Sequence, residues 1–164
     1  MLTRQQFLNQ VRQEAKICRH LWSKIPPGES DRSLGPKMRT TLELLRYLAS
    51  CARVSTWALL EDGWSKLRDQ VDENAALPFE GFPAAMDAQV AKVESLSAAV
   101  SDADLQTRLV KLPWGATMPL GEALVSTALR FLTAYRMQLF LHLKAHGQTA
   151  LNTRDCWLGE DPAA

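Results

Sequence analysis

The chain has 164 residues, 46% of them hydrophobic and 23% charged, a composition typical of one globular domain over residues 1–164. The formal net charge of +1, with no dense run of Lys or Arg, argues against nucleic acid or an anionic membrane as a partner. No apolar stretch reaches the roughly 20 residues of a membrane-spanning helix, and we expect no signal segment at the start of the chain. The three cysteines are widely spaced. We therefore expect a cytoplasmic protein with reduced thiols.

Two long helices are expected in the first part of the chain. Thr3–Lys24 opens with Thr3 and Gln6, which form a predicted capping box, and carries an apolar stripe at helical spacing. Thr40–Leu60 opens with a second capping box, completed by Glu43, and is nearly free of charge, as expected of a helix buried on most sides. The stretch Trp64–Asn74 that follows is ambiguous, with a short extra helix as one alternative.

Two more helices are expected, over Pro83–Val100 and over the charge-poor stretch Pro119–His146. Between them, residues 107–118 alternate in polarity and predict a short hairpin or extended connection. The tail, residues 149–164, lacks periodicity but contains the apolar trio Cys156-Trp157-Leu158, so we expect it to pack on the body or on a partner chain. Together these elements predict an all-α fold, a four-helix bundle with a hairpin or extended connection before its last helix.

One candidate ligand-binding pocket follows from the faces of the second and fourth expected helices. If these faces meet, one spot is lined by Tyr47, Cys51, Phe131, Tyr135 and Gln138, and bundles commonly build ligand and metal sites in such places. The alternative is ordinary core packing, because aromatic residues at helical spacing usually belong to the core. The Cys51 thiol is expected to be buried and unreactive unless a positive neighbour lowers its pKa.

A second candidate site is the pair His142 and His146, which share one face of the last helix at a spacing that can hold one metal ion. No acidic residue accompanies them, and only His20 or Cys156 is a candidate third ligand. The favoured interpretation is therefore capping and surface roles, with no metal bound there. Glycine-rich phosphate loops and the nucleophile elbow of hydrolases do not occur in the sequence.

Three stretches carry a family resemblance. They are Arg39–Leu48 at the second helix start, Leu112–Gly115 before the last helix, and Tyr135-Arg136-Met137-Gln138-Leu139 followed by Leu143–Gly147. Together they resemble the DinB-like superfamily of four-helix bundles over most of the chain. The tail motif Cys156-Trp157-x-Gly159 is similar to a subgroup that lacks the metal-binding histidines.

The resemblance implies where a metal site would lie. Members of the superfamily often bind a divalent metal through one histidine of the second helix and two of the last helix. By position, Tyr47, Phe131 and Tyr135 stand in these places. A neutral imidazole offers a lone pair at neutral pH, whereas Phe has no donor atom, so the resemblance implies no metal cofactor there. It also implies a homodimer.

Three functional hypotheses follow. The first is a DinB-like protein without a metal that binds a small molecule or a partner in the bundle core. The second is a small-molecule transferase or hydrolase-like enzyme, which uses a metal held by His142 and His146 or uses Tyr135, Cys51 and Arg136 without a metal. The third is a structural subunit whose exposed Trp and tail residues bind another protein.

Overall fold

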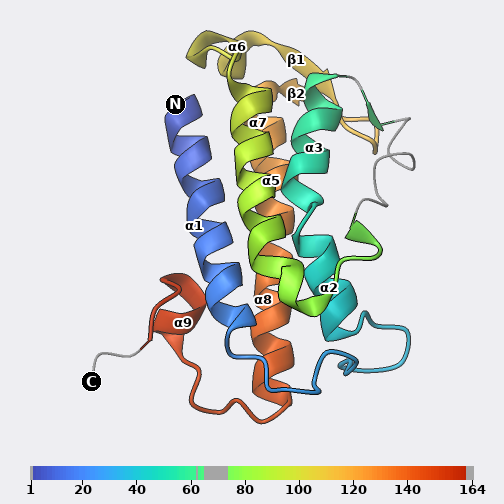
Figure 1. Cartoon of the computed structure of the whole chain (residues 1–164). Coiled ribbons are helices and arrows are strands. Elements are labelled where there is room, and N and C mark those ends of the chain that lie inside the picture. Colours follow the sequence, from blue (N-terminus) through green and yellow to red (C-terminus); the bar gives the residue numbers. More distant parts are fainter. Residues whose placement is uncertain (1, 62, 65–73, 162–164) are drawn as a thin grey trace.

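A computed structural model describes residues 2–61, 63–64 and 74–161, and it is predominantly helical (Figure 1). Four longer helices lie side by side around a shared apolar core: α1 (Arg4–Trp22), α3 (Cys51–Leu60), α5 (Phe82–Ser97) and α8 (Arg130–Ala145). Within the described part of the chain, no helix combines the length and apolarity needed to cross a membrane. Most of the ambiguous stretch Trp64–Asn74 lies outside the described residues.

Both predicted capping boxes are confirmed. The Thr3 hydroxyl accepts a hydrogen bond from the Gln6 amide, and the Gln6 side chain accepts one from the Thr3 amide. The Thr40 hydroxyl and the Glu43 carboxylate form the same reciprocal pair at the start of α2 (Thr41–Leu48). In each case two backbone N–H groups that have no partner within the helix are satisfied, which fixes where the helix begins.

The prediction of one continuous second helix over Thr40–Leu60 is wrong, because the helix breaks between α2 and α3. The fully buried side chain of Gln89, on α5, reaches into this break. Its oxygen accepts hydrogen bonds from the amides of Ala52, at 2.9 Å, and Arg53, at 3.3 Å, while its nitrogen donates to the Leu48 carbonyl at 2.9 Å. Gln89 thus satisfies backbone groups that the break would otherwise leave buried without partners.

The last helical stretch also differs from the single regular helix that we expected. It consists of α7 (Leu120–Leu124), the π-helical segment η4 (Val125–Leu129) and α8. The buried Thr127 hydroxyl in η4 donates to the Ala123 carbonyl at 2.7 Å, a contact that often accompanies bending of a helix. Before α7, the predicted hairpin is confirmed: β1 (Leu109–Lys111) pairs antiparallel with β2 (Thr117–Pro119).

Three short helical elements were not expected. A 3₁₀ turn, η3 (Phe79–Gly81), precedes α5, and α6 (Asp102–Thr107) replaces the turn before the hairpin. The tail forms α9 (Thr153–Trp157), which lies against α1 (Figure 1). Gly159, which follows α9 in the sequence, has a positive φ of 63°. A Cβ atom there would lie 3.0 Å from the Cα of Ile17. Glycine therefore allows the tail to approach the backbone of α1 closely.

Candidate functional site

Two of the five predicted pocket residues meet directly. The rings of Tyr47, on α2, and Tyr135, on α8, have centroids 4.4 Å apart at a tilt of 52°. The Arg39 guanidinium lies over both rings, 4.7 Å from the Tyr47 centroid and 5.3 Å from the Tyr135 centroid. Tyr47 and Tyr135 are half-buried against the core, whereas Arg39 is exposed. Since a cation is attracted to the face of an aromatic ring, the two tyrosines help to hold the Arg39 guanidinium at this position.

Neither Cys51 nor Tyr47 offers an anionic atom to a metal or a substrate at neutral pH. Burial raises the pKa of the Cys51 thiol to about 12, despite nearby backbone amides that lower it. Burial also raises the pKa of Tyr47 well above its ordinary value, and Cys51 and Tyr135 add to this effect. Both groups therefore remain protonated, so Cys51 is poorly suited to act as the nucleophile of a thiol-based reaction.

Phe131 and Gln138 lie on the same helix as Tyr135 and are half-buried. The cavity beside Tyr47 is bordered by neither of them, nor by Cys51 or Tyr135. Its lining includes Arg39, Glu43, Arg46 and Ser50 together with Tyr47. A pocket shared by all five predicted residues therefore stays a prediction.

Two neighbouring cavities, a smaller one along α2 and a larger one between α3 and α5, are together called the α2–α3 groove. They enclose about 300 Å³ and about 430 Å³, and both are bordered by Asn74. Volumes of this size suit a small ligand. The smaller cavity is lined by Arg39, Glu43, Arg46, Tyr47, Ser50, Asn74 and Ala75. The larger cavity is lined by Ala49, Arg53, Trp57, Asn74, Ala85, Ala88, Gln89 and Lys92.

Among the charged side chains that line this groove in the described chain, cations outnumber carboxylates. Among the described lining residues, Arg39, Arg46, Arg53 and Lys92 carry positive charge, and Glu43 is the one carboxylate. The Glu43 carboxylate accepts the hydrogen bond that caps α2 at 2.8 Å. A concave surface with this charge balance attracts an anion.

The two arginines of the smaller cavity have donors available. The Arg46 Nε donates to the Leu77 carbonyl at 3.0 Å, which anchors that side chain. Its two terminal nitrogens have no hydrogen-bond partner among the described residues. Within the described part of the chain, the Arg39 guanidinium contacts the two tyrosine rings and has no hydrogen-bond acceptor or ion-pair partner. A guanidinium without an acceptor keeps its N–H donors available, in a planar fork that matches a carboxylate or a phosphate.

The second candidate site, His142 with His146, has an unusual environment. His142 is fully buried, and neither of its ring nitrogens has a hydrogen-bond partner among the described residues. The two rings meet edge to face with centroids 5.9 Å apart. Burial lowers the pKa of His142, and His146 lowers it further. No further His, Cys, Asp or Glu in the described chain completes a three-residue ligand group with this pair, so His20 and Cys156 do not serve as its third ligand.

A fully buried arginine joins the tail to the helices. The Arg136 Nε donates to the Glu14 carboxylate at 2.8 Å, and its Nη1 donates to the Cys156 carbonyl and contacts the Cys156 sulfur at 3.2 Å. The guanidinium also lies 4.8 Å from the centre of the Trp157 ring. Because the Arg136 guanidinium contacts Glu14, Cys156 and Trp157, its role is structural. None of these contacts directs a donor at Cys51.

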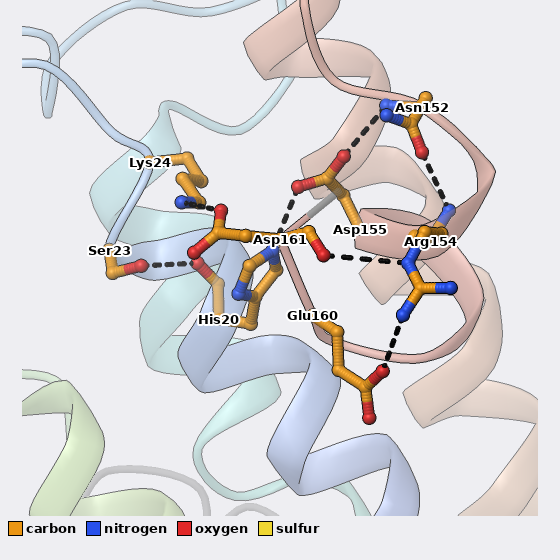
Figure 2. A network of polar contacts seen from close by, with 8 residues as sticks. All are labelled: His20, Ser23, Lys24, Asn152, Arg154, Asp155, Glu160 and Asp161. Atoms are coloured by element: carbon orange, nitrogen blue, oxygen red, sulfur yellow. Dashed lines mark hydrogen bonds and ion pairs between the residues drawn. The ribbon is translucent and has the colours of Figure 1, made fainter. Parts of the chain in front are cut away.

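The tail carries a second polar network at the end of α1 (Figure 2). The His20 Nε2 lies 2.8 Å from the Asp155 Oδ1, and the other Asp155 oxygen accepts a hydrogen bond from the Asn152 amide at 2.8 Å. Asp161 forms an ion pair with Lys24 in the same place. His20, Asp155 and Asp161 bring three ligand-type atoms within 4.8 Å of one another.

The sequence contains part of the signal for the groove. Arg39, Arg46 and Arg53 recur at a spacing of seven residues, which would place the latter two on one face of a continuous helix. In the structure they lie on separate helices, α2 and α3. Lys92 comes from α5, and no local pattern connects it with the three arginines. A comparison with known protein families gives no match for this chain, and a search of curated proteins gives none either.

Proposed function

We propose that this protein binds a small organic anion, a carboxylate or a phosphate monoester, in the α2–α3 groove. The observation that carries the proposal is the Arg39 guanidinium, which lies over the rings of Tyr47 and Tyr135 with no acceptor for its donors in the described chain. Arg46 borders the same cavity and is anchored through Leu77. An anion between the two arginines would receive charge-assisted hydrogen bonds from both.

The expected affinity is modest. A hydrogen bond to a charged group contributes about 1.5–3 kcal/mol, and the exposure of Arg39 places its contribution near the lower figure. Two such arginines, with about 1 kcal/mol of apolar contact to Tyr47, correspond to a Kd between about 0.1 mM and 1 mM. The negative charge of Glu43, on the same cavity, disfavours ligands with acidic groups at both ends.

Isothermal titration calorimetry at low salt tests the proposal with two probes, benzoate and phenyl phosphate. We expect one-to-one binding of at least one probe, weakened about tenfold or more by Arg39→Ala and by Arg46→Ala. Arg12→Ala is the matched control, because Arg12 lies on α1 and pairs with Glu94 away from the groove. If neither probe binds, or if the two groove variants bind as the wild type does, the proposal is wrong.

The remaining expectations about this chain belong to the same proposal. We propose a DinB-like four-helix bundle without a metal at the Tyr47, Phe131 and Tyr135 positions, working in the cytoplasm as a homodimer. The three sequence stretches named above support the family, and the partly exposed Trp157 and Leu158 on the tail support association. Light scattering over a range of concentrations checks the dimer, and a constant monomer mass would contradict it.

A second candidate function is a metal-dependent enzyme with its metal at His142 and His146. The observation in its favour is that both nitrogens of the neutral His142 ring lack partners. The complete burial of that ring and the lack of a third ligand residue in the described chain weigh against it. Stoichiometric metal in protein purified without an affinity tag, lost in His142→Ala, would favour the enzyme over the binding protein.

A further inference from the structure

The C-terminal segment turns back from α9 onto the end of α1 and gathers three side chains with metal-binding chemistry (Figure 2). His20 comes from α1, Asp155 from α9, and Asp161 from the chain that follows. The side chains of His20 and Asp155 are largely buried, with exposed fractions of 11% and 3%. The Asp161 side chain is 69% exposed and forms an ion pair with Lys24.

We propose that His20, Asp155 and Asp161 bind one divalent transition-metal ion, with Zn²⁺ as the best-suited probe. Imidazole nitrogen and carboxylate oxygen bind zinc at about 2.0–2.2 Å, so neighbouring donors of a tetrahedral ion lie about 3.4 Å apart. The His20 Nε2 and the Asp155 Oδ1 lie 2.8 Å apart in a hydrogen bond. To bind the ion, the two atoms separate slightly and the His20 ring takes the tautomer that carries its proton on Nδ1, which frees the Nε2 lone pair. The three donor atoms span at most 4.8 Å, and rotation of the exposed Asp161 closes that distance.

The surrounding contacts prepare Asp155 as a ligand. Burial alone raises its pKa, but the hydrogen bonds from His20 and the Asn152 amide outweigh burial and leave the pKa below its ordinary value. The carboxylate is therefore ionised at neutral pH. The Asn152 amide holds one oxygen at 2.8 Å and directs the other at His20. Three protein ligands leave a fourth position for water, as in open zinc sites.

Lys24 competes with the metal for the same carboxylate. Its ammonium group forms an ion pair with Asp161, and an ammonium and a divalent cation repel each other at that distance. Metal binding must therefore displace Lys24, and removing its charge should strengthen binding. A bound ion would also tie the segment after α9 to α1, because its ligands come from both.

The test is a calorimetric titration of Zn²⁺ into protein that carries no affinity tag and has been freed of metal with a chelator. We expect one zinc ion per chain, at least tenfold weaker binding for His20→Ala and Asp161→Asn, and several-fold tighter binding for Lys24→Met. Glu160→Gln is the matched control: its carboxylate lies in the same segment and pairs with Lys16 and Arg154, outside the cluster. We expect that variant to bind zinc as the wild type does.

The contradicting results are equally specific. The inference is wrong if no one-to-one binding occurs, or if Asp161→Asn, whose exposed position does not endanger folding, binds zinc unchanged. It is also wrong if His142→Ala abolishes binding and His20→Ala does not, since the ion would then lie at the other histidine pair. Arg39→Ala should leave zinc binding intact, which separates this site from the proposed anion site.

Discussion

Replacing Arg136 with methionine tests the structural role of the buried arginine. Methionine is unbranched and uncharged but about two atoms shorter, so Arg136→Met removes the bonds to Glu14 and to the Cys156 carbonyl and leaves a small gap. The Glu14 carboxylate then remains near the core with a side-chain exposure of only 12%. Breaking one partner of a buried ion pair costs about 3–5 kcal/mol, because the other charge is left without compensation.

We expect a loss near the lower end of this range, about 3 kcal/mol, because Glu14 retains the hydrogen bond from the Thr133 hydroxyl at 3.0 Å. For a domain of this size, 1 kcal/mol corresponds to about 2–4 °C in Tm, so Tm should fall by about 6–12 °C. Urea unfolding followed by circular dichroism measures the free energy directly.

The double variant Glu14→Gln with Arg136→Met separates charge from packing. Because it removes both charges, it should be less destabilised than the sum of the single variants by at least about 1 kcal/mol. A smaller coupling would mean that the two groups act independently. If Arg136→Met alone lies within about 1 kcal/mol of the wild type, the buried pair does not hold the tail and helices together as argued here.

Two further stability predictions follow from buried polar groups. Gln89→Leu should lower the free energy of unfolding by about 2–4 kcal/mol, because the Ala52 and Arg53 amides and the Leu48 carbonyl lose their partner at the helix break. Urea unfolding at pH 7 measures this free energy. A neutral or stabilising effect would contradict the prediction. His142→Leu should raise that free energy by about 1 kcal/mol at pH 7, since it removes two buried nitrogens without partners. Because the folded pKa of His142 lies below its ordinary value of about 6.5, the unfolded chain binds the proton first, and wild-type stability should fall as pH drops below about 6.5. His142→Leu should reduce the stability difference between pH 7 and pH 5.5, and an unchanged difference would show that His142 is not its source.

Local sequence patterns predicted much of the helical structure. The capping boxes at Thr3 and Thr40 depend on residues three apart, so their side chains meet whenever the helix forms. The break between α2 and α3 depends instead on Gln89, more than thirty residues away in sequence. No local signal could reveal that contact, because Ala49 and Ser50 are compatible with a continuous helix.

The candidate site was predictable to a lesser degree. The rings of Tyr47 and Tyr135 lie together, a contact that the sequence could predict only if the faces of the second and last helices met. Helical spacing gave no indication that Arg39, which precedes the helix, covers both rings. Arg136 was expected as a neighbour of Cys51, yet its partner Glu14 lies on α1 and its other contacts lie in the tail. Such contacts between distant segments depend on tertiary packing, which periodicity within one helix does not encode.

The central claim is that Arg39 and Arg46 bind an anion in the α2–α3 groove. The most direct measurement is an NMR titration of ¹⁵N-labelled protein with phenyl phosphate, following the Nε–Hε signals of the arginine side chains. The account predicts that the signals of Arg39 and Arg46 shift and saturate together, while that of Arg12, paired with Glu94 on another face, stays in place. Unchanged Arg39 and Arg46 signals, or equal shifts without saturation at all three arginines, would contradict it.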